Sequence, residues 1–276
     1  MATVLVVLAL VLGGASYAAY TVYRHFVTSL TVPGCRAGTG VNALPVDPGQ
    51  APVAATIAGV AARMGLPTRA LEIAYAAALQ ESKLTNLSGG DRDSVGVFQQ
   101  RPSQGWGTVA ELEDPQYAAT AFFKALVKVP NYLSIPMYQS AQDVQHSADG
   151  YAYEQWESTA AQLATAYTAT PHAVTCWYTP SSRGHPQVAP VETRMPEVFG
   201  PAGQAGVLTR VTTGRSGIIV SGRADKGWTV ANWLMSHASM YGLTKVSYDG
   251  WTWSASLTES SWQADPGARA GSILAS

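Results

Sequence analysis

Apolar residues at helical spacing dominate the first half of the chain. Over residues 54–64, Ile57 and Met64 fall on one side, and Gly65 follows as a helix stop. Residues 73–79 are apolar all the way round, which is typical of a helix at the centre of a domain. The pattern predicts two helices, of which the second is buried.

Three more helical patterns follow. Asp114 and Pro115 are residue types that favour an N-cap and the first helical position, and they predict a helix over 114–127. Similar periodicity predicts a short helix over 139–147 and a last one over 153–167. These elements together predict a mainly α domain.

Beyond this domain the pattern changes twice. Residues 179–206 carry five prolines among Ser and Gly residues, which is typical of an extended spacer. Four elements are then predicted: strands over 207–212 and 217–220, a helix over 227–241, and a hairpin at Asp249–Gly250, a type I′ turn signal. They predict a small C-terminal α/β module.

The N-terminus is the most apolar part of the chain. Residues 4–23 contain no charged side chain, and about 20 such residues can span a bilayer. We expect a transmembrane helix or a signal peptide, with Ser16–Tyr17–Ala18 as a small-x-small cleavage site. No Lys or Arg precedes the segment and Arg24 follows it, a charge order that would keep the remainder cytoplasmic.

The content of the later domains favours the opposite orientation. We therefore expect a single-pass cell-membrane protein with its domains outside the cytoplasm, or a secreted protein if the segment is cleaved. The expected organisation is a transmembrane or signal segment at 1–26, a linker at 27–49, the α domain at 50–178, the spacer at 179–206 and the α/β module at 207–276.

Composition narrows the function classes. Apolar residues make up 47% and charged residues 13%, which is enough apolar surface for a core and excludes a disordered acidic or basic protein. The formal net charge is −1 and no basic run exists, so we expect no nucleic-acid partner.

The chain has two cysteines, Cys35 and Cys176, on either side of the α domain. Nothing near them has the spacing of metal ligands, so neither a metal nor another cofactor is expected. Either they form a disulfide that joins the ends of this domain, as export would favour, or they are two unrelated thiols.

One carboxyl group lies at the end of the apolar helix. Glu81 is nine residues after Glu72, which at 100° per residue places the two on opposite faces. The negative end of the helix dipole and partial burial would both raise the pKa of Glu81, as a general acid requires. The alternative is a surface glutamate at a frayed helix end.

Two motifs bear on this choice. The run Ala78-Leu79-Gln80-Glu81-Ser82, followed by Gly96-Val97-Phe98-Gln99-Gln100, resembles the Glu-Ser … Gly-Leu-Phe/Met-Gln signature of the lysozyme-like superfamily. The match is to its soluble lytic transglycosylase and goose-type lysozyme branch. The longer string from Gly90 to Gly107 resembles membrane-anchored actinobacterial proteins that carry such a domain, and the similarity covers about residues 50–178.

The resemblance implies a lysozyme-like fold and a peptidoglycan-cleaving glycosidase. In it Glu81 would protonate the β-1,4 glycosidic oxygen between N-acetylmuramic acid and N-acetylglucosamine. Ser82, Gln99 and Gln100 would contact the substrate or support the groups that do. Arg101 and Trp106 could bind the substrate, Trp106 by stacking on a sugar ring, or could simply pack in the protein.

Asp91 and Asp93 bear on the mechanism. Retaining and inverting glycosidases need a second carboxylate, which either residue could supply. Lytic transglycosylases need none, because the muramyl C6 hydroxyl attacks and forms a 1,6-anhydro product. Since Asp is ordinary in a Gly/Ser-flanked turn, transglycosylase chemistry is favoured over hydrolysis.

The chain departs from the family in one place. The usual Ala-Tyr-Asn-Ala-Gly segment is absent, and residues 144–148 stand near its expected position. The sequence consequently assigns no role to His146, Tyr151 or Tyr153.

A last resemblance rests on the pattern Gly227-Trp228-x-Val230-Ala231-x-Trp233-Leu234 … Gly242-Leu243 … Val246-Ser247-Tyr248-Asp249-Gly250. This pattern resembles C-terminal modules of actinobacterial cell-wall proteins, distantly like hedgehog and carboxypeptidase folds. The His-x6-Asp zinc pattern of those peptidases is absent, so we expect a non-catalytic module. It could bind the wall through its tryptophans or simply bury them (Trp228, Trp251, Trp253 and Trp262). The alternative for the whole chain is a catalytically silent wall-binding or scaffold protein.

Overall fold

The computed structural model describes residues 16, 17, 19, 20, 22, 32–146, 150–168, 170–180, 186–203, 207–214 and 217–276. Most of the expected membrane or signal segment at 1–26, the first residues of the linker at 27–49 and parts of the spacer at 179–206 lie outside them. No helix within the described part is long and apolar enough to cross a membrane.

The helices are α2 (Gln50–Arg63), α3 (Thr68–Ser82), α4 (Val109–Leu112), α5 (Pro115–Leu126), α6 (Met137–Gln145), α7 (Glu157–Thr168), α8 (Val188–Phe199), α9 (Gly227–Ser236) and α10 (Ala238–Tyr241). Short 3₁₀ helices are η1 (Gly40–Asn42), η2 (Pro102–Gln104), η3 (Gly150–Trp156) and η4 (Ala224–Lys226). The strands are β1 (Gly34–Ala37), β2 (Leu44–Val46), β3 (Val174–Trp177), β4 (Leu208–Gly214), β5 (Gly217–Gly222), β6 (Lys245–Tyr248), β7 (Trp251–Ser254), β8 (Gln263–Ala264) and β9 (Ile273–Ala275).

Helix α3 is the centre of the helical layer. Its residues 73–79 are all buried, as the apolar pattern predicts, because α5, α6 and α7 pack around it. Tyr75 donates a 2.8 Å hydrogen bond to the carbonyl of Ala54, which ties α3 to α2. Asp114 caps α5 through a 2.9 Å bond from the backbone N–H of Gln116, which confirms that helix start.

The second layer is a six-stranded antiparallel sheet with the order β4-β5-β9-β6-β7-β8. The predicted hairpin is confirmed: β6 and β7 meet at Asp249 and Gly250, which both have positive φ. The last strand, β9, enters the middle of the sheet between β5 and β6. Residues at the end of the chain therefore complete the sheet.

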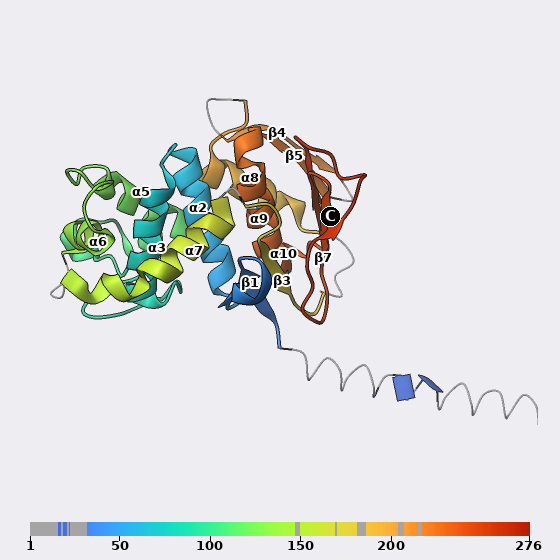
Figure 1. The fold of residues 1–276 in the computed structure, drawn as a ribbon, viewed down its shortest axis with the longest axis horizontal. Helices are drawn as coiled ribbons and strands as arrows, with labels where there is room; N and C mark the ends of the chain where they lie inside the picture. Colours follow the sequence, from blue (N-terminus) through green and yellow to red (C-terminus); the bar gives the residue numbers. More distant parts are fainter. Residues whose placement is uncertain are drawn as a thin grey trace, which may run out of the picture.

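Helix α9 joins the two layers. Every one of its residues is buried, because α2 and α7 contact one side and β6 and β9 another (Figure 1). The indole of Trp233 is fully buried and lies edge-on to Phe199 of α8, with ring centroids 6.0 Å apart. The expected α domain and α/β module therefore share one core.

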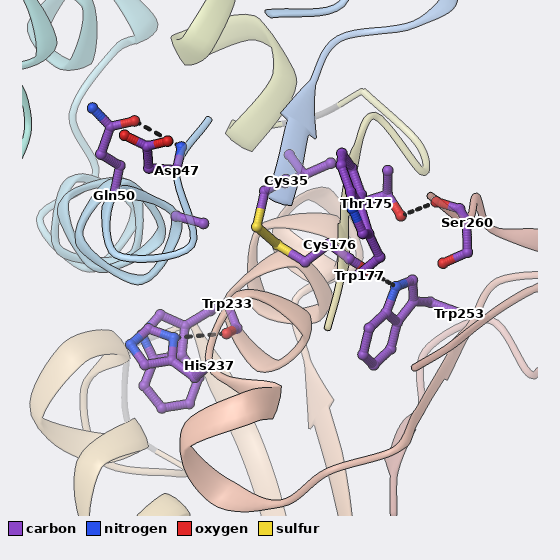
Figure 2. Close-up of a disulfide and its surroundings, with 12 residues drawn as sticks. Cys35, Asp47, Gln50, Thr175, Cys176, Trp177, Trp233, His237, Trp253 and Ser260 are labelled. Carbon is purple, nitrogen blue, oxygen red and sulfur yellow. Dashed lines mark hydrogen bonds between the residues drawn. A yellow bond between two sulfur atoms is a disulfide. The ribbon is translucent and has the colours of Figure 1, made fainter. Parts of the chain in front are cut away.

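A small antiparallel sheet, β2-β1-β3, completes the connection. Cys35 of β1 and Cys176 of β3 are paired directly, with Cα atoms 4.0 Å apart, and the expected disulfide is confirmed (Figure 2). The indoles of Trp253 and Trp262 donate to the carbonyls of Cys176 (2.9 Å) and Val174 (2.7 Å). These bonds attach β3 to the C-terminal part of the chain.

The expected fold class, a mainly α lysozyme-like domain with a small α/β module, is wrong for the described residues, and the transmembrane or signal helix expected with it lies mostly outside them. About 48% of the structure is helical and 17% is in strands, and the strands form two antiparallel sheets. Helices on one side of such a sheet make an α+β fold. The short strands β1 and β2 are too short to show a period in the sequence, and part of the proline-rich 179–206 forms helix α8.

Candidate active site around Glu81

Glu81 lies in the last turn of α3, where the chain leaves the helix through Lys83 in the left-handed conformation. Its carboxylate oxygen Oε1 accepts a 2.7 Å hydrogen bond from the hydroxyl of Tyr153 in η3, and the side-chain amide of Gln145 at the end of α6 also bonds it. Partial burial raises the pKa of Glu81, while these two hydrogen bonds act in the opposite direction because they favour the charged form. The net effect is a carboxyl group that keeps its proton to higher pH than usual.

The segment η3 is held against this end of α3 by side chains. The amide oxygen of Gln80 accepts hydrogen bonds from the indole of Trp156 at 2.8 Å and from the amide of Gln155 at 3.2 Å. The ammonium group of Lys83 lies 4.3 Å from the centroid of the Trp156 ring, in cation–π geometry. These contacts fix the position from which Tyr153 reaches Glu81.

The loop 95–100 packs beside the same helix end. Val95 and Gln100 exchange two backbone hydrogen bonds of 3.0 and 3.1 Å, which close the loop. Gly96 has φ of 77°, and a Cβ there would meet the carbonyl of Leu112, so only glycine fits. Phe98 anchors the loop in the core by stacking on Phe122, with ring centroids 4.5 Å apart.

Ser82 and Gln100, both expected at the substrate, hold this loop in place together with Gln145. Ser82 is buried, and its hydroxyl donates a 2.7 Å bond to the carbonyl of Val97. Gln145 donates a 2.8 Å bond to the carbonyl of Phe98, so its amide connects the loop to Glu81. Gln100 is also buried, with 2% of its surface exposed, and therefore supports the loop from inside.

Gln99 differs from its neighbour because it is half-buried and has a positive φ of 47°. Its amide oxygen accepts a 2.9 Å bond from the hydroxyl of Ser94, and its amide nitrogen donates a 3.1 Å bond to the carbonyl of Gly96. It is the glutamine of the motif that reaches the surface of the loop.

Asp93 is held by its own loop. Its carboxylate accepts bonds from Nε of Arg101 at 2.7 Å and from the backbone N–H and hydroxyl of Ser103 at 2.8 and 3.0 Å. These donors hold the pKa of Asp93 well below its usual range, the backbone bond from Ser103 contributing most. Asp91 is exposed, and its nearest cation is Arg92 at 3.9 Å.

Trp106 lines a hollow beside α5. This hollow has a volume of about 420 Å³, and Arg63 of α2 and Tyr117 of α5 also line it. The structure thus brings Glu81, Ser82 and the loop 95–100 together, and it places Trp106 at the separate hollow beside α5.

Most of the C-terminal tryptophans named above belong to the core. Trp228, Trp253 and Trp262 are buried, whereas Trp251 is partly exposed and its ring lies 4.0 Å from that of His172. Within the described residues no three His, Cys, Asp or Glu side chains are grouped as metal ligands would be.

Sequence reasoning missed the two groups that bond Glu81. Gln145 belongs to the stretch 144–148, which stands in place of the expected family segment, and that substitution was the available signal for it. Tyr153 gives no comparable signal, because its pairing with Glu81 spans 72 positions of the sequence. Neither protein-family models nor curated proteins gave a match to the chain.

Proposed function

We propose that the protein is a peptidoglycan-cleaving glycosidase in which Glu81 is the general acid and base. The observation that carries the proposal is a partly buried carboxyl group with a raised pKa, oriented by a tyrosine hydroxyl at 2.7 Å. A protonated carboxyl group near neutral pH can donate to a glycosidic oxygen, which is otherwise a poor leaving group. The resemblance of residues 78–82 and 96–100 to lytic transglycosylases supports peptidoglycan as the substrate.

The reaction we propose needs one carboxyl group. Glu81 donates its proton to the β-1,4 oxygen between N-acetylmuramic acid and N-acetylglucosamine as the C1–O bond breaks. The resulting carboxylate then accepts the proton of the muramyl C6 hydroxyl, whose oxygen forms the new bond to C1. The product is a 1,6-anhydromuramyl end, and no water is consumed.

The state of the two aspartates supports this choice over hydrolysis. A hydrolase would use a second carboxylate to activate water or to attack C1. Asp93 already accepts three hydrogen bonds within its loop, and Asp91 is fully open to solvent. Either residue would have to change its contacts to take part.

The disulfide supports a location outside the reducing cytoplasm, where such bonds persist and where peptidoglycan lies. Gln99 is the motif residue whose partial exposure suits a sugar contact. The remaining motif residues act on the substrate through the loop that they support.

Digestion of purified peptidoglycan tests the proposal, with products identified by mass spectrometry. We expect anhydro-muropeptides from the native chain and none from Glu81→Gln. Reducing ends would show a hydrolase and refute the transglycosylase mechanism. Binding to peptidoglycan without any cleavage would favour the wall-binding or scaffold alternative.

A further inference from the structure

The hollow beside α5 has a concentration of positive charge. Arg63, Lys124 and Lys128 all line it, and the described lining contains no carboxylate. Lys124 lies in the last turn of α5, where a cation is favourable against the helix dipole. The same helix end also favours Lys128, which follows it directly, but it does not explain Arg63, which comes from α2.

Arg63 is the most constrained of the three cations. Its guanidinium donates to the carbonyl of Glu197 and to the hydroxyl of Thr120, the latter at 2.6 Å. Both acceptors are neutral groups. The carboxylate of Glu197 does not pair with Arg63, since it forms an ion pair with Arg194. Burial lowers the pKa of Arg63, and no carboxylate lies within 4.0 Å to offset this desolvation in the described part of the chain.

Aromatic and neutral polar groups line the same hollow. Tyr117 donates a 3.4 Å bond to the carbonyl of Trp106, and a Cβ at Gly107 would lie 2.8 Å from the Tyr117 ring. The loop that carries Trp106 therefore packs directly on α5 and is preformed. Gln116 and Thr120 add an amide and a hydroxyl to the lining.

We infer that this hollow binds an anionic saccharide, a sugar ring that carries a phosphate or carboxylate group. Its volume of about 420 Å³ lies within the range of small-molecule sites. The rings of Trp106 and Tyr117 offer apolar surface to a sugar ring, and the amide of Gln116 offers partners to its hydroxyl groups. The three cations supply the charge for the acidic group.

This binding site is separate from the cleavage at Glu81, and its test does not depend on that reaction. The assay is an NMR titration of the full chain that follows the indole N–H signals, with Trp106→Phe used to assign the signal of Trp106. The probes are N-acetylglucosamine 6-phosphate and glucuronic acid, with neutral N-acetylglucosamine and inorganic phosphate for comparison. The two acidic sugars distinguish phosphate from carboxylate as the group recognised.

The variant is Lys124→Gln/Lys128→Gln, which leaves the partly buried Arg63 and the fold intact. The matched control is Arg210→Gln/Arg223→Gln, which removes the same charge from two exposed positions in the C-terminal half. We expect at least one acidic sugar to bind about tenfold more tightly than N-acetylglucosamine and to lose about tenfold in affinity in the first variant only.

Several results would overturn the inference. Equal losses in both variants would show non-specific attraction, and inorganic phosphate binding as tightly as the sugar phosphate would show a simple anion site. The absence of any shift of the Trp106 signal at about 20 mM sugar would show no site at all. Tighter binding of a short single-stranded oligonucleotide, lost with the two lysines, would assign the hollow to nucleic acid.

Discussion

Removal of the disulfide should destabilise the protein strongly. The bond joins Cys35 and Cys176, which are separated by 141 positions. In the chain-entropy model, opening a loop of this size returns about 17 cal/mol/K to the unfolded ensemble, or about 5 kcal/mol at 25 °C. Both cysteines are buried, and β1 still pairs with β3 on either side of them, so the native arrangement should survive in Cys35→Ala/Cys176→Ala.

Guanidinium titration followed by tryptophan fluorescence measures the effect, since the chain has eight tryptophans. We expect the double variant to lose about 3–5 kcal/mol of unfolding free energy, and the reduced native chain to lose a similar amount. The single variants should match the double variant, because either one opens the loop. A loss below about 1 kcal/mol would refute the argument that this bond acts by restricting the unfolded chain.

Three further predictions concern substitutions at single positions. Burial lowers the pKa of His237 from 6.5 to about 4, so the unfolded chain takes up the proton at a higher pH than the folded chain does. The unfolding free energy measured in urea titrations should therefore be highest above about pH 6.5 and fall by about 3 kcal/mol towards pH 4. His237→Gln should remove that slope, and an unchanged slope would contradict the assignment. Tyr153→Phe should lower the cleavage rate about tenfold or more. It should also move the alkaline limb of the pH–rate profile to higher pH, because the hydrogen bond that it removes favours the charged form of Glu81. An unshifted limb would show that Tyr153 does not influence the protonation of Glu81 in the reaction. Gly59→Ala should cost about 1–3 kcal/mol in thermal unfolding, because a Cβ there meets Val198 of α8, and a neutral effect would show that α8 can move away.

The sequence predicts the helices around α3 well, because each carries its own period and stop signals. It also predicts the hairpin at Asp249–Gly250, where two adjacent residues specify the turn. It misses the small sheet, whose strands β1 and β3 lie far apart in the sequence and are four residues long. Strand pairing at that distance leaves no local pattern.

The sequence also does not reveal the core that the two halves of the chain share, for a related reason. Helix α8 contains Pro190 in its first turn, where proline is tolerated, and Pro196 near its end, so its composition resembles a spacer. The all-round apolar character of α9 is the signal of a helix between two layers. This apolar pattern of residues 227–236 could therefore have indicated one shared core.

The candidate site shows the same limit. Glu81 is a candidate from the sequence because burial of its helix and the phase of Glu72 are both local properties, and the motif resemblance then favours it. The groups that bond Glu81, Tyr153 and Gln145, come from elements 64 or more positions further along the chain. Their contribution depends on tertiary packing, which one sequence does not display.

The most direct test of the central claim compares two glutamates of the same helix. Glu72 pairs with Arg69 at 3.2 Å near the start of α3, so Glu72→Gln makes the same chemical change away from the site. The rate of muropeptide release from purified peptidoglycan should fall at least about 100-fold in Glu81→Gln and change less than about twofold in Glu72→Gln. Equal rates for the native chain and Glu81→Gln, with both folded, would contradict the assignment of Glu81 as the catalytic acid.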